Sequence, residues 1–135
     1  MEGGELMNDF SDVRILLCTT PTNMCDCFDS LMGQAQQIFK QDPLSGHLFL
    51  FFNRSRDRIK ILFWDRDGFC IWYKRLECGI FQIPRAEDGE QALELTYEQL
   101  TKLLGGIDLY TGRKRRRYRL PSSQKNTKSV RTDLA

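Results

Sequence analysis

Apolar residues recur along this chain with two different periods, and these periods predict its secondary structure. Short apolar or alternating runs, which are typical of β-strands, cover residues 13–19, 47–52, 56–64, 69–75 and 80–83. A longer segment, from Thr22 or Asn23 to about Lys40, has apolar residues at spacings of three and four, which predicts a helix. The apolar stripe of this helix consists of Met24, Phe28, Leu31, Ala35 and Ile38.

Turn and capping residues predict where the elements meet. Asp65-Arg66-Asp67-Gly68 separates two strand-like runs, and its Asp-Gly pair is expected to supply the positive φ angles of a tight hairpin. Thr96 with Gln99 three residues later forms a capping-box pattern, which predicts a short second helix that ends at Gly105-Gly106. We therefore expect an α+β fold, a small antiparallel β-meander of three to five strands with two helices packed on one face of it.

The chain divides into three regions. It has 135 residues, of which 41% are apolar, enough for one small domain. We expect a flexible extension over residues 1–12, the α+β domain over 13–110 and a disordered basic tail over 111–135, which has too few apolar residues to bury. The longest apolar run, Leu48 to Phe52, is too short to span a membrane, and the N-terminus is acidic. We expect a cytoplasmic protein that could associate with the nucleoid.

Charge is segregated along the chain, although the net charge is only +2. Residues 1–53 carry two basic and seven acidic side chains, and residues 76–112 carry the same numbers. Residues 54–75 carry seven basic and three acidic side chains, and residues 113–135 carry nine basic and one acidic. Positive potential confined to one central hairpin and one tail indicates a polyanionic partner that meets limited surfaces.

The carboxylates of the central hairpin do not form a convincing catalytic or metal site. Asp57 and Asp65 lie at opposite ends of one predicted strand, about 26 Å apart at about 3.3 Å per residue. Asp65-x-Asp67-Gly68 could share a metal, but it lacks the further ligands of a calcium loop, and aspartates that stabilise a turn are far more common. Zinc is poorly supported, because there is no C-x-x-C and only one histidine, His47, and Cys25-x-Cys27 alone could hold at most half a site. We therefore expect no catalytic residues, no metal and no cofactor.

The basic side chains of the same hairpin suit a polyanion better. The candidate nucleic-acid contacts on the two strands are Arg56, Arg58, Lys60, Lys74 and Arg75. They could follow phosphates while Trp64 or Trp72 stacks on bases; alternatively, they form a solvated face on which Asp57 and Glu77 pair with arginines. The tail favours nucleic acid, because it adds a dense group of cations: Arg113, Lys114, Arg115, Arg116, Arg117 and Arg119.

Two segments of the chain resemble a known family. They are GHLFLFFNRSRDRIKILFWDRDGFCIWYKRLECG, residues 46–79, and LTYEQLTKLLGGID, residues 95–108. The chain resembles, over about residues 13–108, the TnpB-type accessory proteins that insertion-sequence-sixty-six transposons encode in their second reading frame. The resemblance implies a bacterial protein needed for efficient transposition, which works beside a separate, larger DDE-type transposase. It brings no catalytic residues to this chain.

The sequence is compatible with three functions. The first is a non-catalytic accessory factor of transposition that binds DNA, either at the element ends or without sequence preference. The second is a protein-interaction module that docks on the transposase and has only nonspecific contact with nucleic acid. An enzyme is the weakest of the three, because the chain offers a lone histidine, no nucleophile–base pair and no phosphate loop. The sequence leaves the first two open.

Overall fold

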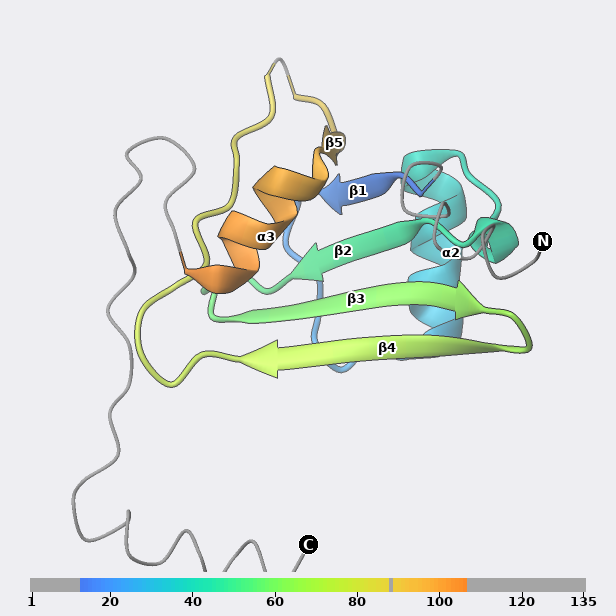
Figure 1. The fold of residues 1–135 in the computed structure, drawn as a ribbon, viewed down its shortest axis with the longest axis horizontal. Coiled ribbons are helices and arrows are strands. Elements are labelled where there is room, and N and C mark those ends of the chain that lie inside the picture. The colour runs from blue at the N-terminus through green and yellow to red at the C-terminus, as the bar shows by residue number, and fades with distance from the viewer. Residues whose placement is uncertain (1–12, 88, 107–135) are drawn as a thin grey trace, which may run out of the picture.

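The computed structural model describes residues 13–87 and 89–106, and it is built on one five-stranded sheet with the order β4-β3-β2-β1-β5 (Figure 1). The strands are β1 (Ile15–Cys18), β2 (Leu48–Phe52), β3 (Arg58–Asp65), β4 (Gly68–Arg75) and β5 (Ala92–Leu95). β1 pairs with β2 in parallel, and the other neighbouring pairs are antiparallel. The predicted extension, the boundary near residue 110 and the tail lie outside the described residues and stay predictions.

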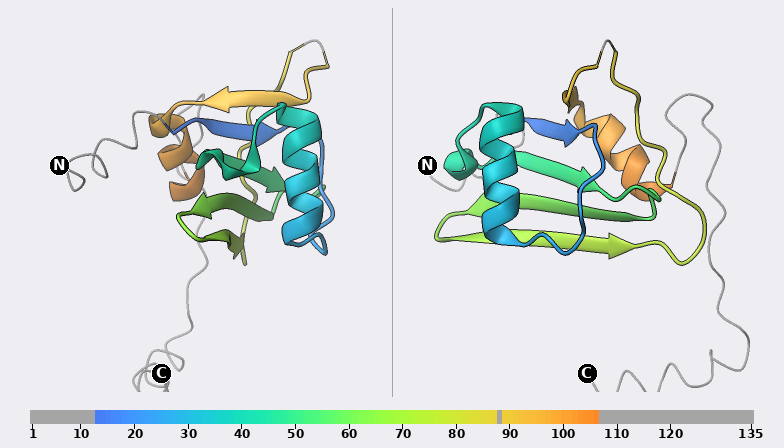
Figure 2. Two further views of the ribbon diagram at one scale, coloured as in Figure 1. Left: turned by 90° about the vertical axis from the view of Figure 1, so that its right-hand side faces the viewer. Right: turned by 180° about the vertical axis from the view of Figure 1, so that it is seen from behind.

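Two α-helices cover the sheet, one on each face. α2 (Phe28–Phe39) and α3 (Tyr97–Gly105) lie on opposite sides of the sheet when it is viewed edge-on (Figure 2). A short 3-10 helix, η1 (Pro43–Ser45), joins α2 to β2. α2 buries Leu31 and Ala35 against one face, and α3 buries Leu100 and Leu103 against the other. The layers are therefore helix, sheet and helix.

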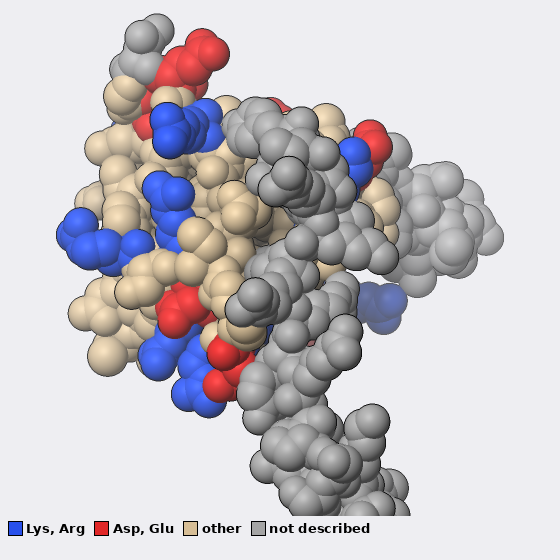
Figure 3. All heavy atoms as spheres, turned by 90° about the vertical axis from the view of Figure 1, so that its left-hand side faces the viewer, with Lys and Arg blue, Asp and Glu red and all other residues tan. Residues whose placement is uncertain are grey.

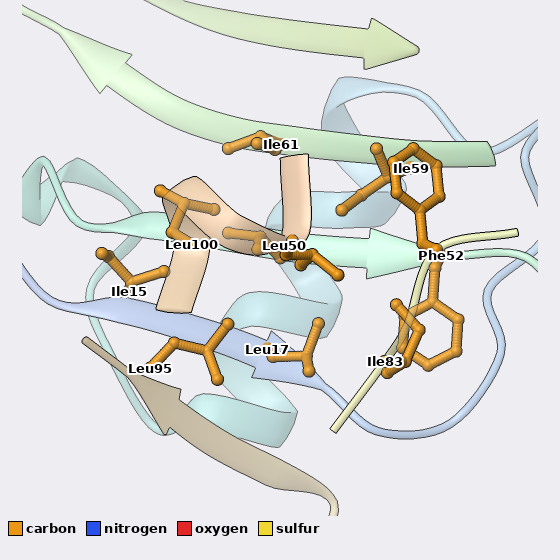
Figure 4. Packing of buried hydrophobic residues seen from close by; sticks show 11 residues of the cluster. Ile15, Leu17, Leu50, Phe52, Ile59, Ile61, Ile83, Leu95 and Leu100 are labelled. Atoms are coloured by element: carbon orange, nitrogen blue, oxygen red, sulfur yellow. The ribbon is translucent and has the colours of Figure 1, made fainter. Parts of the chain in front are cut away.

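The apolar run of β2 explains why the sheet needs cover on both faces. Successive side chains of a strand point to opposite faces. Leu50 and Phe52 belong to the core under α3, which Figure 4 shows, whereas Phe49 and Phe51 belong to the core under α2. All four side chains are at most 2% exposed. A strand without a polar face can be stable only between two apolar layers.

The α+β class, the five strands and the two helices confirm the prediction, but the expected arrangement was wrong in two respects. The sheet is not a pure antiparallel meander, since β1 and β2 are parallel, and the helices do not share one face. Both differences have one cause. α2 lies between β1 and β2 in the chain and carries it back across one face, as a crossover between parallel strands must.

The first helix begins at Phe28, later than the predicted start at Thr22 or Asn23. The residues before it use their polar groups elsewhere. The backbone N–H of Thr22 donates to the carbonyl of Phe52 at 2.8 Å, which ties this segment to the sheet. Asn23 forms a local turn, because its Oδ1 accepts from the backbone N–H of Cys25 at 2.9 Å. A good N-cap residue has here stabilised a turn instead.

The C-terminal half of the described chain shows both a success and an error. Thr96 and Gln99 form both hydrogen bonds of the predicted capping box, and Gly106 ends α3 with a φ of 83°. The predicted strand over residues 80–83 is absent from this part of the structure. Phe81 and Ile83 are nevertheless buried in the core under α3. The strand that completes the sheet is β5, which the sequence pattern did not reveal and which pairs with the distant strand β1.

The β3–β4 hairpin forms where the sequence predicted it, but its turn uses a different residue. Asp65 pairs with Gly68 across the hairpin. The positive φ, 60°, belongs to Arg66 and not to the Asp-Gly pair. A non-glycine residue adopts this left-handed conformation only at a cost in free energy.

Candidate nucleic-acid interface

Arginine side chains gather at one end of the sheet, where β2 ends, β3 begins and β4 ends. We call this region the arginine end; it consists of Arg54, Arg56, Arg58, Arg75 and Arg85. Figure 3 views the molecule from this side and shows Lys and Arg side chains at several places, with acidic side chains between them. The arginine end is thus a mixed surface rather than a uniformly positive one.

The connection between β2 and β3 is organised by the side chain of Asn53. Its Oδ1 accepts from the backbone N–H groups of Asp57 and Arg58, both at 3.1 Å. Its Nδ2 donates to the Asp57 carboxylate at 2.7 Å. The Asn53 carbonyl also accepts from the backbone N–H of Arg56 at 3.0 Å. One asparagine therefore sets the shape of the loop that carries Arg54 and Arg56.

The segment after β4 fixes the same loop from the other side. The backbone N–H of Phe81 donates to the carbonyl of Arg56, and that of Leu76 donates to the carbonyl of Asp57, both at 2.7 Å. Arg56 therefore has both of its backbone polar groups bonded, and it is held at a φ of 62°. The backbone of Arg56 is therefore fixed by the fold, although its side chain is exposed.

The arginines of this end differ in how far their charge is compensated. Arg75 pairs with Glu77 at 2.8 Å, although both side chains are more than half exposed, so the pair contributes little to stability. Arg58 donates to the hydroxyl of Tyr73 at 3.5 Å. Three arginines have no ion pair with any residue that the structure describes: Arg54, Arg56 and Arg85. Among the described residues, no carboxylate compensates the charge of these three side chains.

Lys60 lies in the interior, so its expected surface position is wrong. The residue is 6% exposed, and its Nζ donates to the carbonyls of Met24 and Asp26, both at 2.7 Å. The ammonium group also lies 4.9 Å from the centre of the Tyr73 ring. Lys60 anchors the segment before α2 to the sheet, and it is not positioned to contact phosphate.

The remaining predicted contacts are divided between two faces of the hairpin. Arg58 lies opposite Arg75, so both belong to the face that α2 covers. Lys74 lies opposite Ile59 and therefore belongs to the α3 face. The structure brings Arg56, Arg58 and Arg75 to one end of the sheet. The tail cations, Arg113 to Arg117 and Arg119, lie outside the described residues.

The two tryptophans expected to stack on bases also differ. Trp64 is half-buried and packs edge-on against Phe69 at a centroid distance of 5.1 Å, near the turn at the opposite end of the hairpin. Trp72 is 41% exposed on the α3 face, on the same face as Lys74. Trp72 is therefore the more accessible of the two rings.

Sequence reasoning missed Arg54, Arg85 and the role of Asn53. Arg85 lies in a segment whose acidic net charge hid it, and only the fold places it near Arg56. The asparagine had a weak local signal, since a side-chain amide four residues before an aspartate in a short loop can bond to the backbone of that loop.

A second polar cluster joins β1, β5 and the residue before β2. The guanidinium of Arg14 binds both carboxylate oxygens of Glu94, at 2.8 and 3.2 Å. Nδ1 of His47 accepts from the backbone N–H of Arg14 at 3.0 Å. Partial burial, and then the charge of Arg14, lowers the pKa of His47, while the hydrogen bond from Arg14 lowers the pKa of Glu94. This cluster links three strands and has a structural role.

Within residues 13–87 and 89–106, no group of three or more His, Cys, Asp or Glu side chains is placed to hold a metal ion. Neither α2 nor α3 has the length and apolar character needed to cross a membrane.

Comparisons with known proteins agree with the resemblance in the sequence. The family model described as IS66 Orf2 like protein matches residues 13–117. Two uncharacterized proteins of Sinorhizobium fredii (strain NBRC 101917 / NGR234) are similar to the chain. The protein y4hO is 40% identical over 97 residues, which are 72% of this chain and 83% of y4hO. The protein y4jC is 30% identical over 110 residues, which are 82% of this chain and 92% of y4jC.

No solved structure matches the chain at a significant level. The family match covers the whole described domain and extends into the basic run that begins at Arg113. The chain therefore belongs to the IS66 Orf2-like family, whose members are accessory proteins of transposition.

Proposed function

We propose that this protein is a non-catalytic accessory factor in the transposition of a bacterial insertion sequence and that it binds DNA through the arginine end. The observation that carries the proposal is the state of Arg54, Arg56 and Arg85, which are exposed and make no ion pair with a described residue. Arginine forms two parallel hydrogen bonds to a phosphate, and phosphate contacts dominate the affinity of proteins for DNA.

The placement of these arginines favours phosphate contacts over base readout. Arg54 and Arg56 lie in a loop, Arg85 lies in the connection before β5, and Arg58 and Arg75 lie at strand ends. α2 and α3 both pack their apolar faces on the sheet. Contacts of this kind fix position on DNA and carry little sequence information. We therefore expect weak sequence preference.

The tail is proposed as a second contact with DNA. Its cations, Arg113, Lys114, Arg115, Arg116, Arg117 and Arg119, are six basic residues among seven. Such a strip binds by releasing counterions from the phosphate backbone, so its contribution weakens as the salt concentration rises. If three to five of these side chains contact phosphates, removing the tail after Tyr110 flattens the slope of log affinity against log salt by roughly 3–4.

A salt titration with charge-matched variants tests the proposal. Arg56→Gln/Arg85→Gln removes two cations from the arginine end. Lys40→Gln/Lys102→Gln removes two cations elsewhere, of which Lys40 is exposed and Lys102 is partly buried and pairs with Glu98 at 3.4 Å. Each lost phosphate contact reduces the slope by about 0.9, so the first variant should lose about 2 and the control almost nothing. Equal losses in the two variants would show that only net charge matters, and unchanged binding in the first would exclude the arginine end.

Docking on the DDE-type transposase of the same element is a second candidate function. The observation that favours it is β4, an eight-residue strand at the edge of the sheet that carries Trp72 at 41% and Tyr73 at 47% exposure. A strand at a sheet edge presents backbone groups to which an extended segment of another protein can bind. The acidic segments that flank the hairpin in the sequence give such a contact a further charged surface.

A pull-down with the element's transposase, with and without element-end DNA, separates the two functions. Trp72→Ser removes an exposed ring from β4, and Leu44→Ser removes an exposed apolar side chain at η1 as a control. If docking uses β4, only the first variant loses the transposase. Capture that requires element-end DNA and is insensitive to both changes would instead favour DNA as the primary partner.

A further inference from the structure

An open pocket of about 440 Å³ lies beside the arginine end, where the parallel strands β1 and β2 both finish. Thr19 and Thr20, which follow β1, form one part of its wall, and Arg56 forms another. The connection before β5 forms the remaining wall with Pro84, Arg85 and Glu90. Segments distant in the sequence therefore meet here, and the volume falls in the range of small-molecule sites.

The lining combines three kinds of chemistry. Arg56 and Arg85 are cations without an ion pair to any described residue. Phe52, Ile83 and Pro84 are buried residues that supply apolar surface. Among the lining residues Glu90 is the one with a carboxylate. A ligand that suits this lining combines an anionic group, an apolar part and a hydrogen-bond donor, and a nucleotide has this composition.

The pocket is held in shape by its surroundings. The backbone N–H of Thr19 donates to the carbonyl of Gln91 at 3.0 Å, and its hydroxyl donates to the carbonyl of Glu90 at 2.6 Å. On the other wall, Arg56 is held at a φ of 62° by hydrogen bonds from both sides. Non-glycine residues in this conformation persist where the structure over-determines them, and they cluster at ligand sites.

We propose that this pocket binds a single nucleotide unit of an unpaired DNA strand. Its phosphate binds Arg56 and Arg85, its base lies against Pro84, and the carboxylate of Glu90 accepts from an amine of the base or a hydroxyl of the sugar. The base must be unpaired, because a base stacked in a duplex cannot enter a pocket without being extruded. Glu90 disfavours a second phosphate, so the pocket takes one unit rather than a stretch of backbone. The inference rests on the proposed DNA-binding function and names the form of DNA.

Amide chemical shifts of the full-length protein test this directly. The probes are deoxyadenosine monophosphate, deoxyadenosine and inorganic phosphate, each added over the same concentration range. We expect the monophosphate to shift the amide signals of Thr19, Thr20 and Gly89 in a saturable way, and to bind at least ten times more tightly than either fragment. If inorganic phosphate produces the same shifts with the same affinity, the pocket is only an anion site and the inference is wrong.

Two variants connect the pocket to DNA. Arg85→Gln should lower the affinity for the monophosphate at least tenfold, and it should lower the affinity for single-stranded DNA more than the affinity for duplex DNA. Lys40→Gln should leave all three affinities nearly unchanged. Glu90→Gln should keep the phosphate contacts and reduce the preference for the monophosphate over inorganic phosphate. An equal effect of Arg85→Gln on single-stranded and duplex DNA would overturn the preference for an unpaired strand.

The outcomes separate this inference from the proposed function. If duplex DNA binds through the arginine end and the monophosphate does not shift the pocket signals, the inference fails and the proposed function stands. If the monophosphate shifts these signals and no DNA binds, the proposed function fails, and with it the assignment of the ligand to a DNA strand.

Discussion

Asn53 and Asp57 are joined side chain to side chain by a 2.7 Å hydrogen bond, and the same asparagine accepts from two backbone N–H groups of its own loop. Asn53→Ala removes all three bonds and leaves part-buried donors without partners. We expect the free energy of unfolding to fall by about 1–3 kcal/mol, measured by urea denaturation. DNA affinity should fall as well, because Arg56 loses its fixed position.

The matched control for this prediction is Asn23→Ala. The side chain of Asn23 also forms a local turn, but it accepts a single backbone hydrogen bond in an exposed segment. A loss of stability as large as that of Asn53→Ala would show that the loop network is no more important than an ordinary surface turn.

Lys60→Met should lower stability and leave DNA binding of the folded protein unchanged. The substitution keeps most of the apolar stem but removes the ammonium group that binds the carbonyls of Met24 and Asp26. Hydrogen bonds from charged groups contribute about 1.5–3 kcal/mol, and a loss in this range is expected in urea denaturation. A variant of normal stability with weakened DNA binding would return Lys60 to the contact surface.

Arg66→Gly should stabilise the protein. Arg66 occupies the β3–β4 turn with a φ of 60°, a conformation that costs a side-chain-bearing residue about 1–2 kcal/mol and costs glycine little. Because glycine also loses more freedom on folding, the expected gain is about 0.5–1 kcal/mol, visible as a higher midpoint of thermal unfolding. Arg54→Gly, at an exposed position without a positive φ, should have the opposite sign.

Stability should decrease as the pH falls from 7.5 to 5.5, because the pKa of His47 is lowered by burial and by Arg14. The unfolded chain binds a proton near the usual pKa of about 6.5, whereas the folded protein resists protonation until its lower pKa is reached. Between these two values the unfolded state binds more protons, so stability is lost with falling pH. Urea denaturation at several pH values measures this slope.

His47→Gln serves as the control for the pH prediction, since its amide can accept the same hydrogen bond and does not titrate. The slope between pH 7.5 and 5.5 should become flatter in this variant. Glu94, whose pKa is lowered, contributes at more acidic pH, because its stabilisation is lost as the pH falls below its usual value. An unchanged slope in His47→Gln would assign the effect to another group.

Local patterns predicted the elements whose causes are local. The alternation in β3 and β4, the turn between them and the capping box of Thr96 and Gln99 are all found in the structure. β5 escaped prediction because its partner is β1, and the contact of Arg14 with Glu94 across this pair joins residues 80 positions apart. α2 begins late for the same kind of reason, because the residues before it bind distant parts of the sheet.

The candidate site was predictable to a similar degree. Alternation correctly placed Lys60 on one face of β3 and Ile59 and Ile61 on the other. No local pattern could show that α2 and the segment before it cover the face that carries Lys60. The carbonyl of Met24 that binds Lys60 is 36 positions away. Arg85 reaches the neighbourhood of Arg56 only through the connection between β4 and β5. The basic local charge therefore led to the hairpin arginines, whereas the acidic charge of its segment concealed Arg85.

The position of β1 between β2 and β5 has a consequence for synthesis on the ribosome. β1 is the first strand to be made, and β2 can pair with it once the crossover helix has emerged. The other edge of β1 has no partner until residues 92–95 are made. During that interval the nascent chain exposes a strand edge with the sequence ILLC, which can pair with other chains. Release of a chain that stops before β5 would therefore yield a species prone to aggregate, and complete translation is itself the step that protects this fold.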